Sequence, residues 1–131
     1  MVTGIFALSV IIKINLMRKI AIPVVNNTLS EYFGNCQNYV VFEIVDGHIV
    51  NKSVEVPPNK DIELLPAWIA LQKITDVVTY KIDKRIISLF TQKKINLFVG
   101  IRVNSPLKII DDYLNGTLKS DIDIIKEITE K

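Results

Sequence analysis

The stretch Arg18-Lys19-Ile20-Ala21-Ile22-Pro23-Val24-Val25 is an apolar run that begins after two basic residues and ends at Asn26-Asn27. A short apolar run that stops at turn-forming residues is typical of a strand buried on both faces. Such strands belong to sheets that helices cover on both sides, whereas a half-solvated sheet gives an alternating pattern. The stretch therefore predicts the central strand of an α/β domain.

A β-hairpin is predicted directly after this strand. Asn38 to Val45 and His48 to Val56 are rich in β-branched residues and flank Asp46-Gly47. An Asp-Gly pair between two such runs is a strong signal for a two-residue hairpin turn. Pro57-Pro58 ends the second arm, because proline cannot donate to a ladder. Alternation in the first arm predicts that one of its faces is drier than the other.

The rest of the chain alternates between helix and strand patterns. Apolar stripes, the N-cap candidates Asp83 and Ser105 and the stop at Asn115-Gly116 predict helices over 61–72, 84–93, 105–115 and 120–131. Strands are predicted over 75–80 and 95–101. We expect the last two helices to turn inward Leu107, Ile110, Leu114, Ile122, Ile125 and Ile128.

The composition fits one domain in a reducing compartment. With 131 residues, 49% of them hydrophobic, the chain is long enough for a single core. A net charge of +2 is too small for the basic face of a nucleic-acid-binding protein. Cys36 is the single cysteine, so an internal disulfide is excluded. We expect a cytoplasmic protein with no nucleic acid partner.

Residues 1–16 form an apolar extension that precedes the lead strand. The run is shorter than the roughly 20 residues of a spanning helix, so we expect no stable membrane insertion. It lacks the basic start and small-residue cleavage site of a signal peptide. We interpret it as a start codon assigned too far upstream. The alternatives are an extra strand or helix, or a weakly membrane-associating tail. Residues 17–131 are then a single domain.

Three segments in the right order resemble the dinitrogenase iron–molybdenum cofactor biosynthesis family. They are the lead strand, the loop Ser30-Glu31-Tyr32-Phe33-Gly34-Asn35-Cys36, and Asp111-Asp112-Tyr113-Leu114-Asn115-Gly116-Thr117-Leu118. The family includes NifX-like carriers and the C-terminal domain of NifB-type proteins. The resemblance covers about Met17 to Leu118. It implies an α/β, ribonuclease-H-like fold: a mixed five-stranded sheet of order 3-2-1-4-5 with helices on both faces.

The resemblance also implies a function. It implies a non-enzymatic carrier that accepts or hands on an iron–sulfur or iron–molybdenum precursor cluster, with a metalloprotein partner or a cluster donor. The family loop usually reads Ser/Asp-x-His-Phe-Gly-x-Cys/Ala, and its histidine is the natural cluster ligand. Tyr32 stands at that position. Tyr80-Lys81-Ile82-Asp83 replaces a glycine-rich turn, and Pro57 to Asp61 replaces histidines or glycines. We interpret the chain as one that keeps the scaffold of the family and has lost the metal-binding chemistry of its ligand site to another function.

The candidate site lies where the carboxyl ends of the parallel strands meet. Cys36 is the candidate metal ligand, because a thiolate is a soft ligand for iron. A cluster normally takes about four protein thiolates, so it would need exogenous ligands or a second subunit here. The alternative for Cys36 is a small residue that packs the loop. The residues expected to surround the ligand are Tyr32, Gly34, Asn35, Cys36, Lys81 and Arg102.

Two other functions remain open from the residues. Lys81, Arg102 and two helix N-termini could form a small anion- or nucleotide-binding module. The chain could also be a ligand-free interaction domain that docks on a metalloprotein. Catalysis is not expected, because the lead strand has no acid for a two-metal nuclease and Cys36 is far from His48, the single histidine. Tyr32-Phe33 and Trp68 are expected in the core. We expect a monomer, or a homodimer paired through an exposed edge strand.

Overall fold

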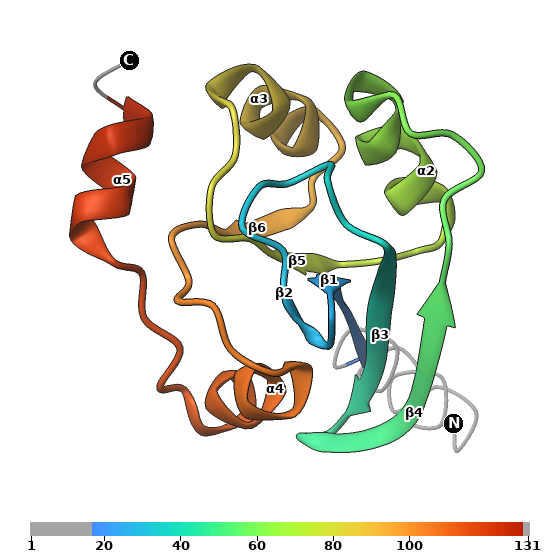
Figure 1. Ribbon diagram of the computed structural model, residues 1–131. Helices are drawn as coiled ribbons and strands as arrows, with labels where there is room; N and C mark the ends of the chain where they lie inside the picture. Colours follow the sequence, from blue (N-terminus) through green and yellow to red (C-terminus); the bar gives the residue numbers. More distant parts are fainter. Residues whose placement is uncertain (1–16, 130–131) are drawn as a thin grey trace, which may run out of the picture.

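The computed structural model describes residues 17–129, so the prediction for residues 1–16 lies outside the described residues. This part of the chain folds as a mixed α/β domain with six strands and four α-helices (Figure 1). The strands are β1 (Met17–Val25), β2 (Thr28–Leu29), β3 (Asn38–Val45), β4 (His48–Glu55), β5 (Asp76–Val78) and β6 (Asn96–Phe98). The helices are the 3-10 turn η1 (Ile62–Leu64), α2 (Leu65–Leu71), α3 (Lys84–Gln92), α4 (Pro106–Asn115) and α5 (Ile122–Thr129).

The sheet is arranged around β1, the strand that the apolar run predicts. Its order is β4-β3-β1-β5-β6, with β2 paired to β1 beside this path. Strand β1 is antiparallel to β3 and parallel to β5, which is parallel to β6. Strand β2 was not expected, because two residues are too few to show a periodic pattern. At the tip of the β3–β4 hairpin, Asp46 and Gly47 have φ values of 54° and 77°, which fits the twist-matched turn expected of Asp-Gly.

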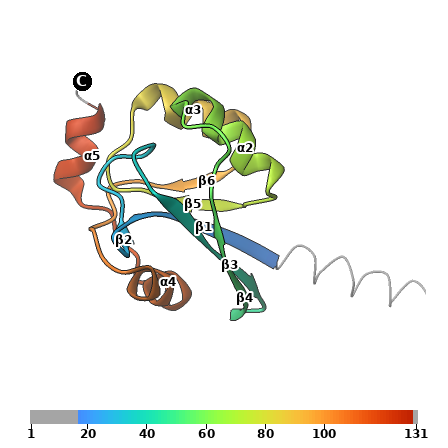
Figure 2. The ribbon, with the colours of Figure 1, turned by 45° about the vertical axis from the view of Figure 1, so that its right-hand side comes forward.

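Helices cover both faces of the sheet and enclose two clusters of buried side chains. Helices α2 and α3 pack on one face and α4 on the other (Figures 1 and 2). Tyr39 and Val41 of β3 point into the first cluster, whereas Val40 and Phe42 point into the second. All four are buried, but further along the strand Ile44 is buried while Glu43 and Val45 are only half-buried. The face of Val40, Phe42 and Ile44 is therefore the drier one, and the prediction of one drier face is confirmed. Ile124 and Ile128 add α5 to the first cluster.

The capping residues predicted from the sequence lie at the observed helix ends. The Asp83 side chain accepts a hydrogen bond from the Arg85 N–H at 2.8 Å, and the Ser105 hydroxyl accepts one from Lys108 N–H at 3.3 Å. Gly116 ends α4 in the left-handed conformation, with φ of 68°. Pro66 sits in the first turn of α2, as its missing N–H requires. No helix in the described part of the chain has the length and apolar character to cross a membrane.

The inward faces of the last two helices follow the prediction only in part. Leu107 is 63% exposed, whereas Ile110 is buried as predicted and Ile109 is buried beside it. Ile122 is 67% exposed, whereas Ile128 is buried as predicted, together with Ile124. The cause is helical phase: isoleucines repeat so often here that several stripes fit, and only the packing partner selects one.

Candidate binding site

The loop over residues 30–36 is fixed by backbone hydrogen bonds at both ends. Ser30 N–H donates to the Pro23 carbonyl at 2.8 Å, next to the β1–β2 pair. Further on, Phe33 N–H donates to the Lys81 carbonyl at 2.9 Å, and Lys81 N–H donates to the Glu31 carbonyl at 3.1 Å. The loop is therefore joined to the segment that leaves β5, as an isolated parallel bridge at Tyr32 and Lys81.

Phe33 and Tyr32 point to opposite sides of this loop. Phe33 is 4% exposed and meets Phe90 of α3 edge to face, with ring centroids 5.3 Å apart. Phe33 is the core anchor that the sequence predicts. Tyr32 is 49% exposed, so its expected place in the core is wrong. Backbone pairing with Lys81 turns the Tyr32 side chain outward, because neighbouring residues of an extended segment face opposite ways.

Gly34 is required at its position in the loop. Its φ is 101°, a conformation that residues with a side chain rarely adopt, and a Cβ added there would lie 2.8 Å from Ile62 Cδ1. The close approach seats the loop against η1. Gly34 is thus a packing residue of the loop, and Ile62 is its partner.

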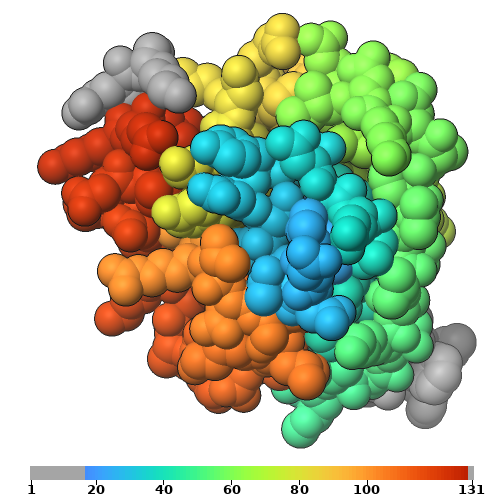
Figure 3. Space-filling model, in the orientation of Figure 1, coloured from blue at the N-terminus to red at the C-terminus, as the bar shows by residue number. Residues whose placement is uncertain are grey.

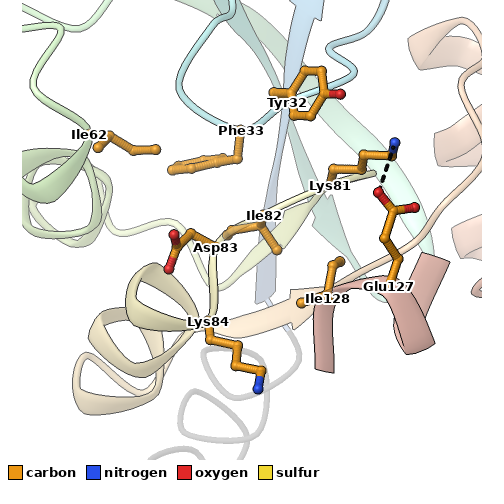
Figure 4. Close-up of a pocket in the computed structure, with 9 residues that line it drawn as sticks. All are labelled: Tyr32, Phe33, Ile62, Lys81, Ile82, Asp83, Lys84, Glu127 and Ile128. Atoms are coloured by element: carbon orange, nitrogen blue, oxygen red, sulfur yellow. Dashed lines mark ion pairs between the residues drawn. The ribbon is translucent and has the colours of Figure 1, made fainter. Parts of the chain in front are cut away.

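A pocket of about 410 Å³ opens beside this loop at the carboxyl end of β5. Loop residues form its upper wall, the start of α3 lies below, and α5 closes one side (Figure 4). Its lining residues are Tyr32, Phe33, Ile62, Lys81, Ile82, Asp83, Lys84, Glu127 and Ile128. On the molecular surface, the cyan loop, the yellow segment after β5 and the red α5 meet on one face (Figure 3).

Lys81 is the central charge of the pocket. Its ammonium lies 3.3 Å from the Glu127 carboxylate, and the side chain is 21% exposed. The ammonium also lies 5.4 Å from the Tyr32 ring centroid and 5.8 Å from that of Tyr80. The hydrogen bond to Glu127 raises the pKa of Lys81 above its ordinary value. The arrangement holds a protonated amine against aromatic faces, which attract cations.

The structure brings together only part of the predicted set. Tyr32 and Lys81 line the pocket, but Arg102 lies in a second pocket of about 560 Å³, formed by the segment after β6, by α4 and by the chain that leads into α5. The Arg102 side chain is 84% exposed and pairs with Asp121 at 3.7 Å. Asn35 is exposed, and its N–H donates to the Tyr32 carbonyl at 3.2 Å. The expected pairing of Lys81 with Arg102 around one ligand is therefore not formed.

Cys36 is half-buried and is absent from the lining of either pocket. It packs against the first core cluster, and burial raises the pKa of its thiol. Among residues 17–129 no three His, Cys, Asp or Glu side chains are grouped so that they could hold a metal ion. His48 is exposed at the hairpin tip, where it pairs with Val45.

Glu127 is one of the pocket residues that the sequence did not indicate. It stands on an amphipathic helix far along the chain from Lys81, and its neighbours form no motif. Ile62 was also missed, although it follows Asp61, a recognisable cap whose side chain accepts from Glu63 N–H. Asp83 was predicted as a helix cap and also lines the pocket.

Comparison with known families assigns the chain to a group of proteins. A family model described as Dinitrogenase iron-molybdenum cofactor matches residues 17–116, which run from the first residue of β1 to the end of α4. The chain belongs to the dinitrogenase iron-molybdenum cofactor family. The resemblance seen in the lead strand, loop and late helix is confirmed, and it indicates an accessory or binding protein of cofactor biosynthesis.

Solved structures support this membership at the level of the fold. The crystal structure of PH0822 has a TM-score of 0.74 and 26% sequence identity, and the match covers 80% of this chain and 97% of that one. The apo form of the orange protein from Desulfovibrio gigas has a TM-score of 0.64 at 11% identity, covering 80% of this chain and 93% of that one. At such identity the second likeness shows the fold alone.

One curated relative matches in sequence over a shorter segment. The protein MJ0580 of Methanocaldococcus jannaschii, named as uncharacterized, is 48% identical over 44 residues. The match covers 34% of this chain and 36% of that protein. The chain thus spans about a third of the length of this relative.

Proposed function

We propose that this protein is a non-enzymatic carrier that binds a small anionic metal–sulfur precursor in the pocket beside Lys81 and passes it to a partner protein. One observation carries the proposal: the pocket holds a protonated lysine close to two tyrosine rings at the carboxyl end of a parallel strand. Ligands of open α/β sheets bind at that end. A volume of about 410 Å³ falls within the range of small-ligand sites.

Charge and packing, rather than thiolate ligation, are the proposed means of holding this cargo. Cys36 is the candidate thiolate, but it stands apart from the pocket and packs against the first core cluster. Lys81 offers up to three N–H donors to an anion, while Phe33 and Ile128 offer apolar walls. A preassembled cluster with its own sulfide ligands fits such a site.

The remaining parts of the proposal are the location of the protein, its partner and its fold class. We infer a cytoplasmic carrier that works with a metalloprotein partner or a cluster donor. We also assign the fold to the ribonuclease-H-like class, which is supported by a central β1 between an antiparallel hairpin and two parallel strands.

A small-anion or nucleotide-binding module is the second candidate, favoured by the same lysine. Both candidates need Lys81. They differ in whether the ligand must contain a metal and sulfur, and inorganic phosphate offers the negative charge without either element. Competition by phosphate at concentrations similar to those of a metal–sulfur anion would favour this second candidate.

The test is a binding measurement on the full chain purified without oxygen. Iron, molybdenum and sulfide are measured in the purified protein, and the apo protein is then titrated with tetrathiomolybdate by equilibrium dialysis and visible absorbance. We expect binding by the parent and by Cys36→Ala, and loss of binding in Lys81→Met. Lys60→Met is the matched control, because Lys60 is exposed and lines neither pocket.

Each other result has a defined meaning. Loss of the probe in Cys36→Ala would replace the proposed mode by thiolate ligation. Absence of metal in the purified protein, together with no binding of tetrathiomolybdate or phosphate, would overturn the carrier proposal and leave a ligand-free interaction domain.

A further inference from the structure

Helix α5 forms one wall of the pocket although it lies beyond the family match, which ends at residue 116. Glu127 and Ile128 of this helix lie across the pocket from Tyr32 and Phe33 (Figure 4). Figures 1 and 2 both show α5 at the side of the domain, apart from the α2–α3 layer and from α4. This wall is thus separate from the segment that defines the family.

Few contacts hold α5 against the domain. The helix has eight residues, too few to be stable alone in water, so it depends on docking. Ile124 and Ile128, each 8% exposed, provide its buried contacts. The chain before the helix is tied by the Asp121 N–H, which donates to the Gly100 carbonyl at 2.7 Å. The far turn can therefore move away while the start of the helix stays tethered.

The Glu127 carboxylate occupies the position that an anionic ligand needs. It is 3.3 Å from the Lys81 ammonium, an ion pair that joins the last turn of α5 to the pocket. A carboxylate presents the same charge and acceptor atoms as a small anion. Glu127 occupies one of the three N–H donors of Lys81, so a ligand that takes all three must displace it.

We propose that α5 is an autoinhibitory lid, in which the Glu127 carboxylate competes with the anionic ligand for Lys81. Binding of the anion displaces Glu127 and undocks the last turns of α5. Return of the helix restores the Lys81–Glu127 pair and expels the ligand. The proposal rests on the proposed function, because it describes the regulation of the same pocket.

The first test removes the competing charge and keeps the shape of the side chain. Glu127→Gln in the full chain should bind tetrathiomolybdate at least tenfold more tightly than the parent in equilibrium dialysis. Asp123→Asn is the matched control: it removes the same charge from the same helix, but Asp123 is exposed and lines the second pocket. We expect its affinity to stay within twofold of the parent.

A second measurement follows the helix itself. Hydrogen exchange of the backbone amides over residues 122–129 should become faster in Glu127→Gln and in the parent saturated with tetrathiomolybdate. Exchange over 84–92, in α3, should stay unchanged. Adding Lys81→Met to Glu127→Gln should abolish the gain in affinity, because the contested ammonium is then absent.

The outcomes separate this proposal from the carrier function. If the parent binds the probe, but Glu127→Gln binds no more tightly and α5 stays protected, the lid is overturned and the carrier stands. If neither the parent nor Glu127→Gln binds, both are overturned. Binding by Glu127→Gln alone supports both, and a gain in affinity that survives Lys81→Met overturns the competition for Lys81.

Discussion

Arg18 of β1 and Asp76 of β5 form an ion pair of 3.1 Å across two parallel strands, with the Asp76 side chain 1% exposed. Three more side chains donate to this carboxylate: Thr75 at 2.8 Å, Asn96 at 3.0 Å and Tyr113 at 3.4 Å. A buried charge persists when its acceptor sites are filled in this way. The network joins β1, β5, β6 and α4 at the end of β5 away from the pocket.

Asp76→Ala should destabilise the domain without changing ligand binding. The variant leaves four donors without this acceptor, and we expect a loss of about 3 kcal/mol in the free energy of unfolding. Urea denaturation measures it. Asp111→Ala, at an exposed position of α4, is the control and should change stability by less than about 0.5 kcal/mol. Equal midpoints for the two variants would contradict the role of the network.

Gly34→Ala should cost more than Gly47→Ala. Both glycines have positive φ, 101° and 77°, so both variants strain the backbone by about 1 kcal/mol. At Gly47 an added Cβ meets no atom within 4 Å, whereas at Gly34 it would press against Ile62. We expect Gly34→Ala to lose about 2 kcal/mol in total, and to weaken tetrathiomolybdate binding because Ile62 lines the pocket. Identical urea midpoints for the two variants would refute the contact.

Tyr39→Phe should stabilise the protein, most of all at alkaline pH. The Tyr39 hydroxyl is buried with no hydrogen-bond partner among the described residues. The Cys36 thiol is a polar group close to it, but a thiol is a weak hydrogen-bonding partner, so the hydroxyl gains little from this contact. Removing it should add about 1 kcal/mol at pH 7.

The alkaline effect has a definite sign. Burial raises the pKa of Tyr39 above its ordinary value, so above about pH 10 the unfolded chain loses a proton that the folded protein keeps. Stability therefore falls as the pH rises, by up to about 1.4 kcal/mol per pH unit for this group. Tyr39→Phe should show a shallower fall in urea midpoints from pH 9 to 11. Some slope remains, since burial also raises the pKa of Cys36 and Tyr113. Parallel curves for parent and variant would contradict this account.

Lys81 and Arg102 should differ sharply in ligand binding, although sequence alone pairs them. Lys81→Met removes the ammonium from the pocket and should abolish binding of tetrathiomolybdate in equilibrium dialysis. Arg102→Met should bind within twofold of the parent, because its guanidinium lies in the second pocket and pairs with Asp121. Equal losses in the two variants would show that a single ligand spans both pockets.

Features that depend on nearby residues were predictable. The apolar run of β1 shows directly that both faces of the strand are covered, and Asp46-Gly47 determines its turn by backbone preference alone. The caps Asp83 and Ser105 act on donors two or three residues away. In each case the physical cause lies within a few residues of the element that it shapes.

Features that depend on distant residues were not predictable. Helical spacing allows Leu107 to face inward, but the position of α4 on the sheet selects Ile109. Lys81 and Arg102 follow neighbouring strands, yet the chain turns at Gly100, with φ of 75°, before Arg102. The pairing of Lys81 with Glu127 arises from the docking of α5, which no local pattern encodes.

The make-up of the pocket wall bears on when a carried cluster would be released. Histidine is the side chain whose ordinary pKa lies near neutrality, and none is among the nine residues that line this pocket. Modest acidification of the surroundings therefore offers no trigger for unloading. Release would depend instead on a partner protein that contacts α5. The cargo would then leave when the two proteins associate and would stay bound at other times.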